Sequence, residues 1–115
     1  MRLTYLSFSD RGEALAARLA AALGGEAARC GRSVSLDEWT STSFEEAQGL
    51  VFVGAAGIAV RAIAPYVKSK TSDPAVVVVD ECGRFAVPIL SGHLGGANDL
   101  ARRIARALCT SRFSP

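Results

Sequence analysis

Short runs of apolar residues alternate along the chain with longer stretches in which apolar residues recur every three or four positions. The short runs are typical of buried strands, and the longer stretches are typical of helices that cover a sheet. The predicted strands are Leu3–Phe8, a weak one within Glu26–Ser35, Leu50–Val53, Ala75–Val79 and Arg84–Ile89. The predicted helices are Asp10–Leu23, Leu36–Gln48, Ile58–Tyr66 and Gly95–Leu108. This alternation predicts an α/β fold, a three-layer Rossmann-like domain with a mostly parallel sheet.

Local signals refine these elements. Asp10 and Glu13 have the spacing of a capping box at the start of the first helix. Pro65 is expected to kink or restart the third helix, because proline cannot continue the hydrogen-bond ladder of a helix. Cys82-Gly83 is a candidate hairpin turn, which would return the chain along Arg84–Ile89. We therefore expect an antiparallel hairpin at one edge of the sheet.

Length and charge limit the classes of function. The 115 residues suit one domain, and the net charge of +2 is too small to indicate a nucleic-acid-binding protein. The same charge suits a small anionic ligand if the basic groups converge on one pocket. The longest apolar run, Leu50–Val60, is far shorter than the roughly 20 residues of a membrane-spanning helix. The start of the chain lacks a secretory pattern, so we expect a cytoplasmic protein without membrane or nucleic-acid partners.

The cysteines and the missing motifs narrow the chemistry further. The three cysteines are far apart, match no Cys-x-x-Cys spacing and are interpreted as small apolar residues. The chain lacks the sequence patterns of a phosphate-binding loop, a dinucleotide-binding fingerprint and a nucleophile elbow. A zinc site would need more histidines or paired cysteines. We therefore expect no metal held by the protein.

The first candidate site is the turn Gly54-Ala55-Ala56-Gly57, which follows a predicted buried strand. Backbone N–H groups at the start of the next helix can hold a carboxylate or phosphate, and Arg61 lies one turn further along. A purely structural use of the two glycines explains the pattern equally well. Both interpretations are open at this point.

The second candidate site is Ser91-Gly92-His93-Leu94-Gly95-Gly96-Ala97-Asn98-Asp99, which contains the only histidine of the chain. Backbone donors, an imidazole and polar side chains would meet there, just before a helix. The alternative is that His93 caps the helix or packs in a loop. Because both glycine turns follow strands of one sheet, we expect His93, Asn98, Gly57 and Arg61 to line one cleft at its carboxyl edge.

Residues 50–105 closely resemble the N-terminal domain of the cobalamin biosynthesis protein CbiG. The resemblance is carried by Gly54, Gly57-Ile58-Ala59-Val60-Arg61, Ile63-Ala64-Pro65, Lys70, Asp73-Pro74-Ala75-Val76, Asp80-Glu81, Gly83, Ser91-Gly92-His93 and Gly95-Gly96-Ala97-Asn98. The first 49 residues share the β-α pattern of the family but little of its signature. The resemblance implies that residues 1–110 are the family's N-terminal domain, followed by a short tail, residues 111–115. The C-terminal domain of the family is expected to be absent from these 115 residues.

The resemblance also implies a reaction. Its substrate is cobalt-precorrin-5A, a cobalt-bearing macrocycle that carries acetate and propionate carboxylates. Members of the family open the δ-lactone on ring A with water and release acetaldehyde, which gives cobalt-precorrin-5B. The cobalt belongs to the substrate, so no further cofactor is expected. A C-terminal domain or subunit of the same enzyme is the expected partner.

Lactone opening needs an acid or base and donors for the developing oxyanion. His93 is the first candidate for the acid or base, and Glu81 is the second, although Asp80-Glu81 also fits a solvated turn. The expected substrate-binding residues are Gly54, Gly57, Arg61, Ser91, Gly95, Gly96 and Asn98. Three functions stay open: a hydrolase domain, a corrinoid-binding module whose catalytic groups lie elsewhere, and a general anion-binding domain that shares only the scaffold.

Overall fold

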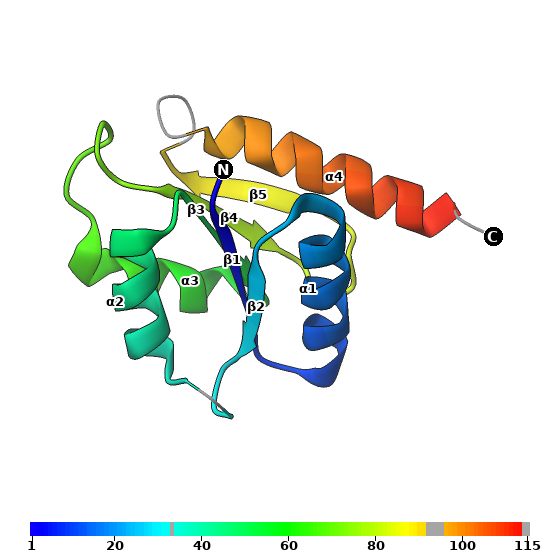
Figure 1. Ribbon diagram of the computed structural model, residues 1–115, viewed down its shortest axis with the longest axis horizontal. Coiled ribbons are helices and arrows are strands. Elements are labelled where there is room, and N and C mark those ends of the chain that lie inside the picture. The colour runs from blue at the N-terminus through cyan, green and yellow to red at the C-terminus, as the bar shows by residue number, and fades with distance from the viewer. Residues whose placement is uncertain (33, 92–95, 114–115) are drawn as a thin grey trace.

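The computed structural model describes residues 1–32, 34–91 and 96–113 (Figure 1). Its strands are β1 Leu3–Ser7, β2 Glu26–Arg29, β3 Gly49–Val53, β4 Ala75–Val79 and β5 Ala86–Leu90. Its helices are α1 Asp10–Leu23, α2 Leu36–Glu46, α3 Ala56–Ile63 and α4 Ala97–Phe113, and a 3₁₀ turn, η1, spans Ala64–Tyr66. The weak second strand is therefore real, and α4 runs three residues beyond the domain boundary predicted at residue 110.

The five strands form one sheet in the order β2-β1-β3-β4-β5. The first four are parallel, and β5 is antiparallel to β4, with Val78 opposite Val87. The predicted α/β class and the antiparallel edge hairpin are confirmed. Because β5 runs backwards, its last residue, Leu90, lies opposite Val76 near the start of β4.

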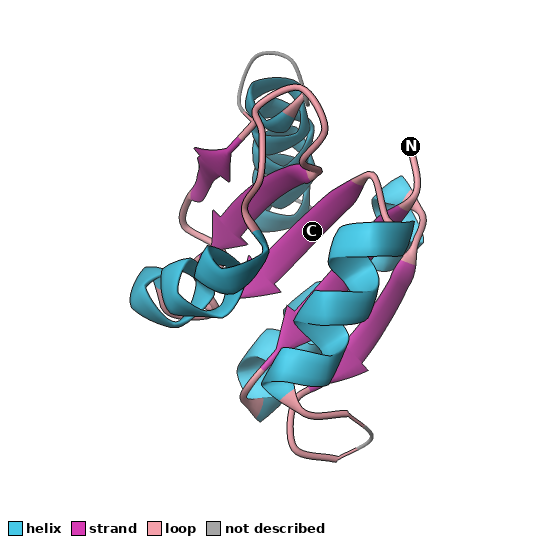
Figure 2. Cartoon of the chain, turned by 90° about the vertical axis from the view of Figure 1, so that its left-hand side faces the viewer, coloured by secondary structure: helices cyan, strands magenta, loops and turns pink. Residues whose placement is uncertain are grey.

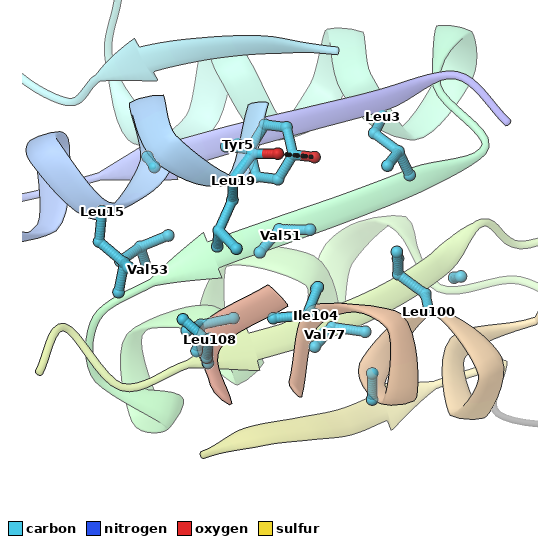
Figure 3. Close-up of a cluster of buried hydrophobic side chains, with 14 of the residues drawn as sticks. Leu3, Tyr5, Leu15, Leu19, Val51, Val53, Val77, Leu100, Ile104 and Leu108 are labelled. Atoms are coloured by element: carbon cyan, nitrogen blue, oxygen red, sulfur yellow. Dashed lines mark hydrogen bonds between the residues drawn. The ribbon is translucent and has the colours of Figure 1, made fainter. Parts of the chain in front are cut away.

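Helices cover both faces of the sheet, which explains why its central strands are apolar along their whole length (Figure 2). On one face, α1 and α4 pack on alternate residues of the strands, such as Tyr5, Val51 and Val77 (Figure 3). On the other face, α2 and α3 pack on the intervening residues, such as Phe52 and Val78. The phenol of Tyr5 donates to the Gly24 carbonyl at 2.8 Å, and burial raises the pKa of this phenol.

The helix ends follow the sequence signals with small shifts. The N-cap of α1 is Ser9, whose Oγ accepts a hydrogen bond from the Gly12 amide at 3.0 Å. The predicted capping box of Asp10 and Glu13 is wrong, because both carboxylates form ion pairs with Arg29 instead. Pro65 acts as predicted, since α3 stops at Ile63 and the 3₁₀ turn follows. No described helix is long and apolar enough to cross a membrane.

Candidate functional site at the carboxyl edge of the sheet

The strand order locates the best position for a ligand. The helix that follows β1 lies on one face of the sheet, and the helix that follows β3 lies on the other. α/β sheets bind ligands at such a switch point, beyond the carboxyl ends of the strands. Phe8 and Ser9 follow β1 there, and Gly54 follows β3. Asp80 and Glu81 follow β4 at the same edge. This edge is therefore the candidate site.

Glu81 is held in place by a residue from the other end of the chain. Ser9 Oγ donates to Glu81 Oε2 at 2.6 Å, across the end of the intervening strand β3. The same hydroxyl accepts from the Gly12 amide, so the start of α1 fixes its direction. Glu81 is only partly buried, which leaves its carboxylate accessible. The carboxylate is thus oriented at the edge where a ligand would bind.

The neighbouring Asp80 forms hydrogen bonds within the turn after β4. Its backbone carbonyl accepts from the Gly83 amide at 2.7 Å, and its carboxylate accepts from Arg84 Nε at 2.9 Å. The hydrogen bond from Arg84, together with its charge, lowers the pKa of Asp80. Asp80 therefore closes the hairpin turn, whereas Glu81 forms no ion pair among the described residues.

The two glycines of the first turn differ in their surroundings. A Cβ on Gly54 would lie 3.0 Å from Phe8 Cδ1, and the Gly54 amide donates to the Val79 carbonyl at 2.9 Å. Gly54 therefore serves packing. A Cβ on Gly57 would meet nothing within 4 Å, and Gly57 is exposed in the first turn of α3. Packing does not explain a glycine at that position.

The start of α3 offers free donors to an anion. Its N-cap, Ala55, has no side chain that could accept a hydrogen bond from the first-turn amides. Arg61 is exposed on the same helix and forms no ion pair with any residue the structure describes. These amides and this guanidinium can together bind a carboxylate.

The second predicted segment does not join this site. Ser91 Oγ donates to the Asp73 carbonyl at 3.2 Å, and the Ala97 amide donates to the Ser91 carbonyl at 3.1 Å. A Cβ on Gly96 would lie 3.3 Å from Met1 Cε. Asp73 precedes β4 and Met1 precedes β1, so Ser91, Gly96 and Asn98 lie at the amino edge of the sheet.

The prediction of a single cleft is therefore wrong. Asn98 lies at the amino edge of the sheet, whereas Gly57 and Arg61 lie on the helix that starts at the carboxyl edge. The reason is the direction of β5, which carries the chain back to the amino edge before the segment begins. His93 and Gly95 lie outside the described residues. The cysteine interpretation is also wrong in part, because Cys82 and Cys109 are exposed and only Cys30 is partly buried.

Comparison with protein families shows which family the chain belongs to. The model of the family described as Cobalamin synthesis G N-terminal matches residues 38–112, which is more than half of the chain. The chain belongs to this family. The matched range includes the glycine turn after β3, Glu81 and the segment after β5, whereas Ser9 precedes it.

Two named relatives support the match to this family. It is 54% identical over 66 residues to a cobalt-precorrin-5A hydrolase of Salmonella typhimurium, an alignment that covers 57% of the chain and 19% of that protein. It is 51% identical over 65 residues to a cobalt-precorrin-5A hydrolase of Priestia megaterium, which covers 56% of the chain and 17% of that protein. The chain thus spans less than a fifth of the length of these curated relatives in the aligned regions.

A solved structure extends the likeness to the whole Cobalamin synthesis G N-terminal fold. It is described as that of a cobalamin biosynthesis protein G homolog from Sulfolobus solfataricus, and it superimposes with a TM-score of 0.78 at 28% identity. The superposition covers 94% of this chain and 34% of that chain. The first β-α unit, which includes Ser9, therefore belongs to the shared fold.

Sequence reasoning missed Ser9, which lies at the candidate site and contacts Glu81. Its contact with Glu81 spans 72 positions of the chain. Only the strand order brings the ends of β1 and β4 together. A serine before a helix carries no such information by itself.

Proposed function

We propose that this chain acts in cobalamin biosynthesis as the N-terminal domain of a cobalt-precorrin-5A hydrolase. In the proposed reaction, water opens the ring A δ-lactone of cobalt-precorrin-5A, and the products are cobalt-precorrin-5B and acetaldehyde. The observation that carries the proposal is the family match over residues 38–112 together with the two hydrolases that are 54% and 51% identical. The cobalt is proposed to enter with the substrate.

The carboxyl edge supplies groups for this chemistry. Glu81 accepts through Oε1 the proton of the water that attacks the lactone carbonyl, while Ser9 holds Oε2 at 2.6 Å. The ring C–O bond of the lactone then breaks, and the proton passes from Glu81 to the oxygen that is released. The first-turn amides of α3 and Arg61 bind peripheral carboxylates of the macrocycle. In this proposal the exposed Gly57 lets a carboxylate approach the backbone closely.

His93 stays an alternative acid or base. Its described neighbours Ser91 and Gly96 lie at the amino edge, whereas Glu81 lies at the carboxyl edge. His93 and Glu81 are alternative candidates for the role of acid or base. Ser91, Gly96 and Asn98 are proposed to contact the ligand or the rest of the enzyme from the amino edge, and Gly95 is kept as a proposed substrate-binding residue.

A test compares Glu81→Gln with the wild-type sequence, each supplied with the C-terminal part of the Salmonella typhimurium relative. We expect acetaldehyde release from cobalt-precorrin-5A to fall by roughly 100-fold, because a positioned general base contributes about 10²- to 10⁴-fold in rate. Glu45→Gln, an exposed change on α2, serves as the control. Unchanged release by Glu81→Gln would remove Glu81 from the mechanism and favour His93.

A second candidate function, a corrinoid-binding module without its own turnover, is favoured by the small share of the relatives that the chain covers. Macrocycle sites usually bury most of the ligand, and one domain covers only one side of it. The chain alone is expected to bind cobalt-precorrin-5A but to release acetaldehyde slowly, and the added C-terminal part is expected to restore the rate. Full release by the chain alone would exclude the module, and absence of binding would contradict both functions.

A further inference from the structure

A hollow lies at the carboxyl edge, on the face of the sheet opposite to α3. It has a volume of about 290 Å³, is open to solvent and is lined by residues of α1, the turn after β4 and α4. Its lining includes Arg11, Leu15, Arg18, Glu81, Gly83 and Leu108. Three segments that are far apart in the sequence thus form one pocket.

The pocket has a basic rim. Arg11 and Arg18 are seven positions apart, which is about two turns, and therefore lie on the same side of α1. Arg11 Nη1 donates to Cys82 Sγ at 3.1 Å, which directs this guanidinium toward the turn after β4.

These two arginines differ from others nearby. Arg29 and Arg32 pair with Asp10 and Glu13, and Arg84 pairs with Asp80. Arg11 and Arg18 are exposed and form no ion pair within the part of the chain that the structure describes. Glu81 brings one negative charge to the rim, so the two guanidinium groups outweigh it.

The floor of the pocket is apolar and fixed. Leu15 and Leu108 are each 5% exposed, and both lie at the end of the buried cluster toward which the β3 arrow points (Figure 3). Gly83 has a φ of 73°, and a Cβ there would lie 3.5 Å from Leu108 Cδ2. The turn therefore packs closely on this floor. An apolar floor below a basic rim matches a short aliphatic arm that ends in a carboxylate.

We infer that this pocket binds one acetate or propionate arm of a corrinoid ligand, with Arg11 and Arg18 as its cationic groups. The inference rests on the proposed function for the identity of the ligand. Arg61 and the amides of α3 lie on the other face of the sheet, so a macrocycle placed over the carboxyl edge is held from both sides. Glu81 lies on the rim of the pocket, and its hydrogen bond with Ser9 crosses the end of β3.

The test is binding of cobyrinic acid, a cobalt corrinoid with free carboxylates, to the 115-residue chain and to Arg11→Gln/Arg18→Gln. We expect the double variant to bind at least about tenfold more weakly, because it loses charge-assisted hydrogen bonds. The loss should shrink as salt is added, since both arginines are exposed. In the wild-type chain, the NMR signal of the Gly83 amide should shift during the titration.

The matched control is Arg102→Gln/Arg106→Gln, which removes the same two charges from exposed positions of α4 outside the pocket. We expect this control to change the affinity less than about twofold, and melting curves of both variants should resemble that of the wild-type chain. The heptamethyl ester of cobyrinic acid, which has no carboxylate, should not distinguish the Arg11/Arg18 variant from wild type.

Equal affinity of the Arg11/Arg18 variant and the wild-type chain would overturn the inference, as would an equal loss in both double variants. Absence of cobyrinic acid binding by the wild-type chain would overturn it as well. Acetaldehyde release is scored separately. A wild-type chain that binds cobyrinic acid through the arginines but yields no acetaldehyde with the C-terminal part keeps the pocket and rejects the proposed reaction.

Discussion

The two glycines after β3 differ in the atoms that surround them. Gly54 and Gly57 are three positions apart and look alike in the sequence, yet only Gly54 has a neighbouring side chain that would crowd an added Cβ. A glycine without packing or backbone need inside a helix weakens that helix. Gly57 is therefore the better indicator of a ligand that approaches the backbone.

Replacing each glycine with alanine separates the two roles. Gly57→Ala is expected to stabilise α3 by about 0.5 kcal/mol and to raise the melting temperature by about 2–4 °C. The same methyl group should weaken cobyrinic acid binding roughly fivefold by blocking the first-turn amides. Gly54→Ala should lower the melting temperature, because the Phe8 ring, 3.0 Å from the new methyl group, must move. Unfolding curves and binding titrations check both variants, and unchanged affinity in Gly57→Ala would mean that no ligand approaches this backbone.

The sequence identified Glu81 as a candidate but could not identify Ser9. Glu81 follows a strongly β-branched strand, so its place at a carboxyl edge follows from local pattern alone. The contact between Ser9 and Glu81 depends on which strand lies between them. Such information is held in the packing of the entire sheet.

At the scale of elements, the hairpin of β4 and β5 fixes Glu81 through its neighbours. Arg84 and Asp80 tie the two ends of the turn together at 2.9 Å, and the guanidinium lowers the pKa of Asp80. A lowered pKa in the folded chain means that the ionised carboxylate stabilises the fold. This stabilisation is present above the ordinary pKa of 3.8 and is lost as the pH falls through the lower folded value.

Arg84→Gln tests this link. The pKa of the Asp80 carboxyl, followed by NMR titration, is expected to rise toward its ordinary value of 3.8. The variant should be slightly less stable than the wild-type chain near neutral pH, and the difference should vanish in acid below the folded pKa. Chemical unfolding at several pH values measures the difference. A gap of the same size at every pH would show that the ion pair does not contribute through the charge of Asp80.

The elements themselves were largely predictable, because the apolar strands and the amphipathic helices have different periods. The antiparallel direction of β5 was also predicted from Cys82-Gly83. The segment after β5 was nevertheless expected at the carboxyl edge of the sheet. This expectation holds for a parallel strand, whereas the antiparallel β5 ends at the opposite edge. In the structure, Leu90 lies opposite Val76, and the segment that follows begins at the amino edge.

At the scale of the whole molecule, the domain presents two edges and two covered faces (Figures 1 and 2). The carboxyl edge carries Ser9, Glu81 and the arginines around them, whereas Ser91 and Asn98 belong to the amino edge. The superposed homolog from Sulfolobus solfataricus is longer, since the superposition covers 34% of its chain.

The reversed last strand has a thermodynamic consequence. The five residues of β4 separate the two edges by roughly 15 Å, and residues that far apart without shared partners change a free energy independently. Arg61→Ala should weaken cobyrinic acid binding by about 1–2 kcal/mol at low salt, and less at high salt. If Asn98→Ala also affects binding, the loss in the double variant should equal the sum of the two single losses within about 0.5 kcal/mol. For Ser9→Ala and Glu81→Gln, the loss of binding free energy in the double variant should differ from the sum of the two single losses, because those side chains share one hydrogen bond.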